Sequence, residues 1–206
     1  LRAPLQAVLG YADRLAQGIG GELAPAQREY VARIAAGGTS LLQIVENLLG
    51  YSAAQIGRQR VDPATFDVRT AVADVVALAE PLAARKALAL RAELPAVPVP
   101  ATTDRGKLRQ IVTNLVGNAI KFTERGEVVV TVESCDAGRV RIAVRDTGHG
   151  IPAEELAHLF EPFWQGGRRS HGAGEGTGLG LSIVREIARL LGGEATVASA
   201  PGAGST

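Results

Sequence analysis

Three polar side chains recur along one face of a predicted helix near the middle of the chain. Asn114, Asn118 and Lys121 follow one another at spacings of four and three residues. Residues at these spacings share a helix face, so two amides and one ammonium group point the same way. The apolar residues of the segment lie on a different face: Leu108, Ile111, Val112, Leu115 and Ala119. Amide oxygens suit a hard divalent cation and lysine suits the phosphates that such a cation bridges, whereas the alternative is a solvated polar face.

A second candidate is Asp146, which ends the strand-like segment "RVRIAVRD". It continues the inward-facing row of that segment, which is Val140, Ile142 and Val144. A carboxylate at the edge of a core needs a hydrogen-bond donor, and the exocyclic amine of adenine would provide one. Gly148 and Gly150 then let the backbone turn sharply and approach a ligand closely. The alternative is a turn aspartate that caps its own loop.

The third candidate is a set of glycines, Gly176, Gly178 and Gly180, that leads directly into a predicted helix. Backbone N–H groups and the positive end of the helix dipole at such a place favour an anion. Spaced glycines also occur in dinucleotide-binding folds, but there they follow a strand, and here they follow a polar loop. That loop, residues 164–177, is glycine-rich and is predicted to act as a lid over the ligand.

The elements that must position these residues begin after about residue 60. Helical periodicity covers 68–86, 104–123, 153–160 and 181–193, and strand patterns cover 88–94, 127–134, 139–146 and 194–199. "CDAG" between the two alternating strands predicts a β-hairpin, and the Pro-rich "LPAVPVPA" predicts an extended connection. Helices combined with a mainly antiparallel sheet predict an α/β sandwich.

The first part of the chain has a different pattern. Apolar residues at helical spacing predict one helix that ends near "QGIGG" and a second helix from Pro25 to about Ser52. Such a hairpin has too little core to be stable alone, and pairing two copies as a four-helix bundle would bury both apolar stripes. We therefore expect a homodimer through residues 1–58, a linker at 59–66 with a turn at Asp62-Pro63, and an α/β sandwich over 67–206. The fold class is α+β.

Composition excludes several classes of protein. The chain has 206 residues, of which 46% are hydrophobic and 21% charged, and its net charge is +1. It is long enough to bury at least one core, and its near-balanced charge does not favour nucleic acid. No apolar run approaches the roughly 18 residues of a membrane helix, so any membrane anchor is expected outside this segment. The start at Leu1 and the end at "GAGST" suggest a fragment whose C-terminal strand is truncated.

Together these three candidates resemble the nucleotide-binding domain of the gyrase, chaperone, histidine-kinase and mismatch-repair ATPase superfamily. The sensor histidine kinases fit best. "NLVGNAIKF" resembles that family's asparagine box, "DTGHGIP" its first glycine box, "LFEPFWQ" its phenylalanine box and "GTGLGL" its second glycine box. The resemblance covers residues 65–206.

The resemblance implies a role for each site residue. Asn118 would ligate Mg²⁺, Asn114 would support the metal and the phosphates, Lys121 would contact phosphate, and Asp146 would bind the adenine amine of ATP. Asn114 and Lys121 would be the catalytic pair. The remaining nucleotide-binding residues would be Phe122, Gly148, Gly150, Ile151, Phe160, Phe163, Gly176, Thr177, Gly178, Leu179 and Gly180. Among these, the two phenylalanines of the phenylalanine box would pack and hinge the lid.

The first five residues, "LRAPL", are similar to the end of the kinases' phospho-acceptor motif, H-E-L-R-x-P-L. The histidine and its acidic neighbour would come immediately before Leu1 and are not in this sequence. The resemblance implies a cytoplasmic autokinase, or the cytoplasmic part of a membrane-anchored sensor, that passes phosphate to a response-regulator aspartate. Asn114 stands where hydrolytic relatives have a glutamate, and an amide cannot act as a base at neutral pH.

Two alternatives follow from the same residues. A nucleotide-binding regulatory scaffold would lack a competent acceptor histidine, and a clamp-type ATPase is disfavoured by Asn114 and by the helical hairpin. Ala3 occupies a position where the family often has threonine or asparagine, so weak phosphatase activity is expected. The three histidines, His149, His158 and His171, are interpreted as surface residues, without metal-ligand spacing.

Overall fold

The computed structural model describes residues 2–55, 60–135, 138–166 and 177–206. The chain divides into two compact units, Leu1–Gly57 and Arg58–Thr206. Within the described residues, no helix is both long enough and apolar enough to cross a bilayer.

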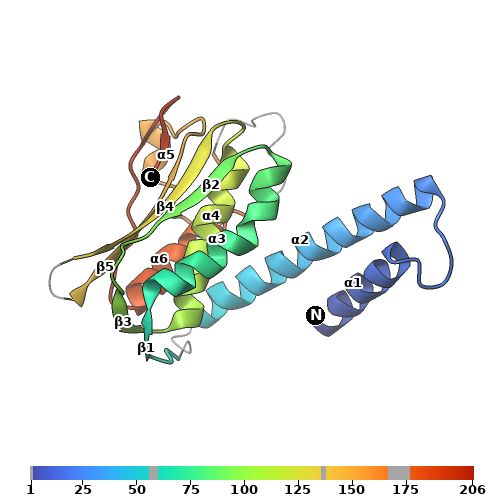
Figure 1. The fold of residues 1–206 in the computed structure, drawn as a ribbon, viewed down its shortest axis with the longest axis horizontal. Coiled ribbons are helices and arrows are strands. Elements are labelled where there is room, and N and C mark those ends of the chain that lie inside the picture. Colours follow the sequence, from blue (N-terminus) through green and yellow to red (C-terminus); the bar gives the residue numbers. More distant parts are fainter. Residues whose placement is uncertain (1, 56–59, 136–137, 167–176) are drawn as a thin grey trace. The chain divides into compact units, whose positions relative to one another are not determined.

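The first unit is a helical hairpin made of α1 (Arg2–Ala16) and α2 (Pro25–Gln55), as predicted (Figure 1). The two helices approach closely at Gly38, where a β-carbon would lie only 2.9 Å from Cδ2 of Leu9. Few side chains are buried in this unit, and among its described residues they are Ala12, Val31 and Val45. Most of the other apolar side chains that the structure describes in this unit are exposed.

The second unit contains one five-stranded sheet, one two-stranded sheet and several helices. Its elements are β1 (Ala64–Asp67), α3 (Val68–Arg85), β2 (Ala89–Glu93), β3 (Pro100–Thr103), α4 (Arg105–Phe122), β4 (Glu127–Ser134), β5 (Val140–Asp146), α5 (Ala153–Leu156), α6 (Gly180–Leu190), β6 (Ser199–Ala200) and β7 (Gly204–Ser205). The strand order of the larger sheet is β2-β4-β5-β7-β6, and β1 pairs with β3. Only β2 and β4 are parallel, and the other pairs are antiparallel.

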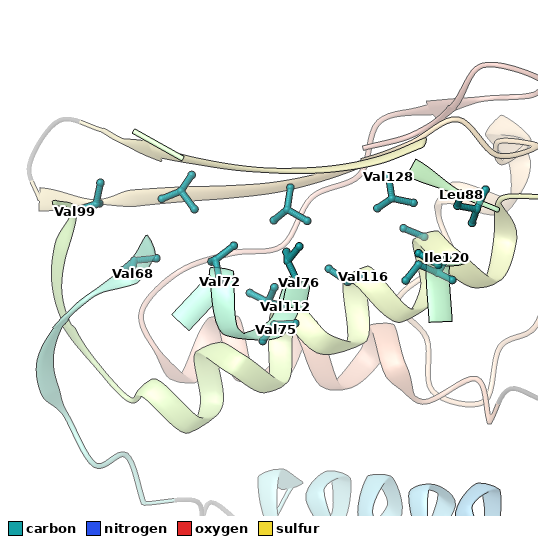
Figure 2. Close-up of a cluster of buried hydrophobic side chains, with 14 residues drawn as sticks. Val68, Val72, Val75, Val76, Leu88, Val99, Val112, Val116, Ile120 and Val128 are labelled. Atoms are coloured by element: carbon teal, nitrogen blue, oxygen red, sulfur yellow. The ribbon is translucent and has the colours of Figure 1, made fainter. Parts of the chain in front are cut away.

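Helices α3, α4 and α6 cover one face of the larger sheet, which confirms the predicted α/β sandwich (Figure 1). Valine side chains from α3, α4 and β4 interdigitate between the helices and the sheet (Figure 2). The inward-facing row of β5 packs against this cluster as the alternation predicts: Val140, Ile142 and Val144. Val112 and Val72 are 0% exposed, so the core is closed around the middle of α4.

Both long helices of this core begin at an aspartate. The carboxylate of Asp67 accepts a hydrogen bond from the backbone N–H of Arg69, and that of Asp104 accepts one from the N–H of Lys107. These caps satisfy backbone donors that have no partner within the helix. They define where α3 and α4 start, and therefore which residues of α4 lie beside α6.

Three elements differ from the sequence predictions. The segment treated as a linker, 59–66, contributes the first residues of β1, because β3 offers it a pairing partner across Ala64↔Thr103. The predicted strand at 194–199 overlaps the observed β6 only at Ser199, and the pairing of this segment is limited to Ser199 and Ala200 with β7 and to Ala198, which exchanges two backbone hydrogen bonds with Thr206. The predicted helix at 153–160 stops at Leu156, and Pro162 further on disfavours a helical residue before it.

Candidate functional site

The site begins on α4, whose middle carries the two asparagines predicted from spacing. Asn114 and Asn118 are half-buried, one helical turn apart. Their side-chain amides make no hydrogen bond to any residue that the structure describes. The opposite face of α4, with Val112 and Val116, is buried against the sheet, so core packing turns the two amides away from the sheet.

Gly180, the first residue of α6, lies beside both amides. A β-carbon on Gly180 would be 3.7 Å from Oδ1 of Asn114 and 3.9 Å from Nδ2 of Asn118. Leu179, the N-cap of α6, supplies no side-chain hydrogen bond to the helix. The N-terminus of α6, with its positive dipole end, therefore faces two amide groups across a space that no side chain of Gly180 fills.

Apolar packing holds α6 in this place. Leu179, Ile183 and Ile187 are each no more than 3% exposed and form a cluster against Ile111 of α4. Thr177 adds a local restraint, because its hydroxyl accepts a hydrogen bond of 3.2 Å from the N–H of Leu179. The second glycine motif is thus tied to the helix that carries the asparagines.

The C-terminal turn of α4 carries Lys121 and Phe122. Nζ of Lys121 lies 4.9 Å from the centre of the Phe122 ring, a cation–π contact. The His149 ring makes a T-shaped contact with the same Phe122 ring, at a centroid distance of 5.7 Å and an interplanar angle of 81°. Burial and, second, the charge of Lys86 lower the pKa of Lys121 from its ordinary value.

Asp146 lies at the end of β5, next to this turn. Its Oδ1 accepts a hydrogen bond of 2.8 Å from the N–H of Gly148, so one oxygen does cap its own loop. The other oxygen, Oδ2, accepts none from the described part of the chain. A β-carbon on Gly148 would lie 2.5 Å from the carbonyl oxygen of Phe122, and this close backbone approach brings the asparagine helix and the first glycine motif together.

The next two candidates contact the C-terminal strands. Gly150 has a φ of 69°, and a β-carbon there would collide with the carbonyl group of Ala200. The N–H of Ile151 donates a hydrogen bond of 2.8 Å to Oγ of Ser199. These contacts hold the turn after Asp146 against β6.

Phe163 and Gly178 flank the predicted lid. The N–H of Phe163 donates a hydrogen bond of 3.0 Å to the carbonyl of Gly178, so the two ends of the loop meet. Both residues have positive φ, 63° and 68°, and a β-carbon on Gly178 would lie 2.5 Å from the carbonyl carbon of Phe163. Gly176 and most of the predicted lid, with His171, lie outside the described residues.

Three residues near the site were missed or underrated by sequence reasoning. Lys86, between α3 and β2, donates hydrogen bonds to the end of α4. The Arg185 guanidinium lies 5.7 Å from the centre of the Phe160 ring, and its Nε has no partner among the described residues. His149, interpreted as a surface residue, is exposed but contacts Phe122. None of these residues belongs to a periodic pattern that would have indicated its contact.

The donors at this site fit a magnesium-bound polyphosphate. Two half-buried amide groups supply neutral oxygens for a hard cation, and the open N-terminus of α6 faces them. Lys121 adds a positive charge at the C-terminal end of α4, the helix that carries both amides. The missing side chain at Gly180 leaves room for a ligand atom where a methyl group would otherwise stand.

Comparison with known families matches both units. Residues 103–206 match the family described as histidine kinase-, DNA gyrase B- and HSP90-like ATPase. Residues 1–57 match the His Kinase A (phospho-acceptor) domain.

Sequence similarity to individual proteins extends over the whole chain. The chain is 40% identical over 207 residues to histidine protein kinase DivJ of Caulobacter vibrioides, covering 100% of this chain and 34% of DivJ. It is 37% identical over 206 residues to sensor histidine kinase RcsC of Salmonella typhimurium, covering 100% of this chain and 21% of RcsC. The chain therefore spans about a third or less of the length of these two relatives.

Among solved structures, full-length ShkA in complex with AMPPNP superimposes with a TM-score of 0.80 at 35% identity. The similarity covers 99% of this chain and 42% of the ShkA chain.

Proposed function

Since the chain belongs to the sensor histidine kinases, with a phospho-acceptor domain followed by an ATPase domain of the histidine kinase, gyrase and HSP90 type, we propose that it is the ATP-dependent autokinase core of a two-component system. The observation that carries this proposal is the position of Gly180. A β-carbon on Gly180, the first residue of α6, would lie within 4 Å of two amide side chains on α4. An anion-binding helix end opposite two cation ligands suits the phosphates of a nucleotide.

Asn118 and Asn114 would hold Mg²⁺ and support the phosphates, and Lys121 would contact the phosphates from the same helix. When bound, Mg²⁺ neutralises charge on the phosphoryl group that is transferred. Asp146 would accept a hydrogen bond from the exocyclic amine of adenine through its Oδ2, because Oδ1 already binds the N–H of Gly148. ShkA, the similar structure that contains a nucleotide analogue, supports the assignment of ATP as the ligand.

Phosphoryl transfer at this site would depend on positioning and on charge neutralisation. The proposed acceptor is an imidazole just before Leu1, in the motif of which "LRAPL" is the end. Its neutral ring nitrogen would bond to the γ-phosphorus as the bond to the bridging oxygen breaks and ADP leaves. Asn114 cannot take a proton from water, so transfer is favoured over hydrolysis.

The helical hairpin supports homodimerisation. Its exposed apolar side chains include Val8, Tyr11, Leu15, Tyr30, Ile34 and Leu41, each at least 42% exposed. A second copy that packs against these residues would complete a four-helix bundle. The phosphoryl group would then pass to the aspartate of a response-regulator receiver domain. The proposed place of this reaction is the cytoplasm.

Labelled ATP provides the test. A chain that includes the residues before Leu1 should acquire a label that is stable to base and labile to acid, as phosphohistidine is. Asn118→Ala should abolish labelling, because it removes the proposed magnesium ligand, and Thr113→Ala, an exposed position on the same helix, should not. Nucleotide binding without any labelled histidine would indicate the regulatory scaffold instead.

A further inference from the structure

Lys86 follows the last residue of α3 and lies against the C-terminal turn of α4. Its Nζ donates hydrogen bonds to the carbonyl oxygens of Ile120 at 2.8 Å, Lys121 at 2.7 Å and Thr123 at 3.3 Å. The last carbonyls of a helix have no partner within the helix, and the helix dipole is negative there. A single ammonium group therefore satisfies three acceptors at the end where a positive charge is most stabilising.

The same turn is restrained from two other directions. The hydroxyl of Thr123, which is 0% exposed, donates a hydrogen bond of 2.7 Å to the carbonyl of Ala119. The carbonyl of Phe122 packs against Gly148, as described above. The restraint from Lys86 comes from a residue outside the sequence motifs that indicated the site.

The turn that Lys86 holds also carries Lys121. The backbone carbonyl of Lys121 accepts the shortest of the three hydrogen bonds, and its side chain lies over the ring of Phe122. Terminal turns of helices fray when their carbonyls lose their partners. Without the cation from Lys86, the orientation of the Lys121 side chain would vary with the fraying of this turn.

We propose that Lys86 is a positioning residue for nucleotide phosphates, which fixes the last turn of α4 and through it the ammonium group of Lys121. This inference rests on the proposed function. It differs from a general stabilising role, because it predicts an effect on phosphate binding that depends on Lys121. After burial, the charge of Lys86 is the second cause that lowers the pKa of Lys121.

Calorimetric titration of the chain with AMP-PNP and with adenosine tests the proposal. Lys86→Met should weaken AMP-PNP binding about threefold to tenfold. Loss of a cation from the C-terminus of a helix destabilises the terminal turn by an amount of this order, and the apparent affinity falls with the fraction of molecules that are competent to bind. Adenosine, which has no phosphate, should bind to Lys86→Met with the same affinity as to the unaltered chain. Lys86→Arg should restore most of the affinity, and Arg85→Met, which removes the adjacent exposed charge, should leave both affinities unchanged.

A double-mutant cycle separates positioning from support of the fold. If Lys86 acts through Lys121, Lys86→Met should add no further loss of AMP-PNP affinity in a Lys121→Met background. An equal loss in both backgrounds, or an equal loss for adenosine and AMP-PNP, would overturn the proposal. So would unchanged AMP-PNP binding by a folded Lys86→Met chain.

Should Lys86→Met fail to fold, Lys86→Gln keeps a hydrogen-bond donor without the charge and is subject to the same comparisons. Failure of the unaltered chain to bind AMP-PNP would instead refute the proposed function, and the role of Lys86 with it. The two failures are therefore distinguishable.

Discussion

Gly180→Ala should separate the stability of the fold from the binding of nucleotide. The new methyl group would lie 3.7 Å from Oδ1 of Asn114 and 3.9 Å from Nδ2 of Asn118, which are ordinary van der Waals distances. The substitution therefore introduces no steric clash in the folded chain. Alanine is a better helix former than glycine by up to about 1 kcal/mol, so the free energy of unfolding should stay the same or rise.

Nucleotide binding should change in the opposite direction. The methyl group would occupy the space between the N-terminus of α6 and the amides, where the proposal places phosphate and Mg²⁺. Loss of one hydrogen bond to a charged group costs about 1.5–3 kcal/mol. The Kd for AMP-PNP with Mg²⁺ should therefore rise about 10-fold to 150-fold.

Calorimetry for binding and thermal unfolding for stability give the two measurements. Gly117→Ala is the matched control, because Gly117 is an exposed position on the asparagine helix where a β-carbon would have no neighbour within 4 Å. It should raise the Tm by about 2–4 °C, as a gain near 1 kcal/mol does for a chain of this size, and leave binding unchanged. Unaltered AMP-PNP affinity in a stable Gly180→Ala chain would refute the placement of phosphate beside Asn114 and Asn118.

Further predictions concern the lid junction, the core, acid stability and the dimer. Gly178→Ala should lower the free energy of unfolding by more than about 1 kcal/mol, because the new β-carbon would face the backbone of Phe163 at a positive φ; urea unfolding would measure this, and no loss would contradict it. Val112→Ala should cost about 2 kcal/mol in the same assay, since this side chain is 0% exposed, and a negligible cost would mean that the core is looser than described. Hydrogen bonds from Arg69 are the main cause that lowers the pKa of Asp67 from 3.8 to about 2, so its stabilising contribution is complete above pH 3.8 and is lost as the pH falls toward 2. Asp67→Asn should remove that part of the acid dependence of urea unfolding, and an unchanged pH profile would show that other carboxylates dominate. Ile34→Glu, at a 51% exposed position of the hairpin, should shift light-scattering mass from dimer toward monomer, whereas a stable dimer would exclude this face.

Much of the fold could be predicted because its signals are local. The period of apolar residues located α4 to within one residue at each end, with 104–123 predicted and Arg105–Phe122 observed. Alternation along β5 correctly placed Val140, Ile142 and Val144 toward the core. The strand at 194–199 was predicted to start too early, because strand formation depends on a pairing partner, and β7, the partner of β6, is only two residues long.

The residue types of the candidate site were determined by the sequence alone: two amides and a lysine on one helix face, an aspartate after a strand, and glycines before a helix. The tertiary structure determined which of these residues lie close together. Packing of Leu179, Ile183 and Ile187 against Ile111 brings Gly180 beside Asn114. Lys86 reaches the end of α4 from a loop 34 residues away in sequence, as its hydrogen bond to Ile120 shows. Periodicity reports which residues share a face of one element, whereas contacts between distant elements depend on how their faces pack, and a single sequence does not state that packing.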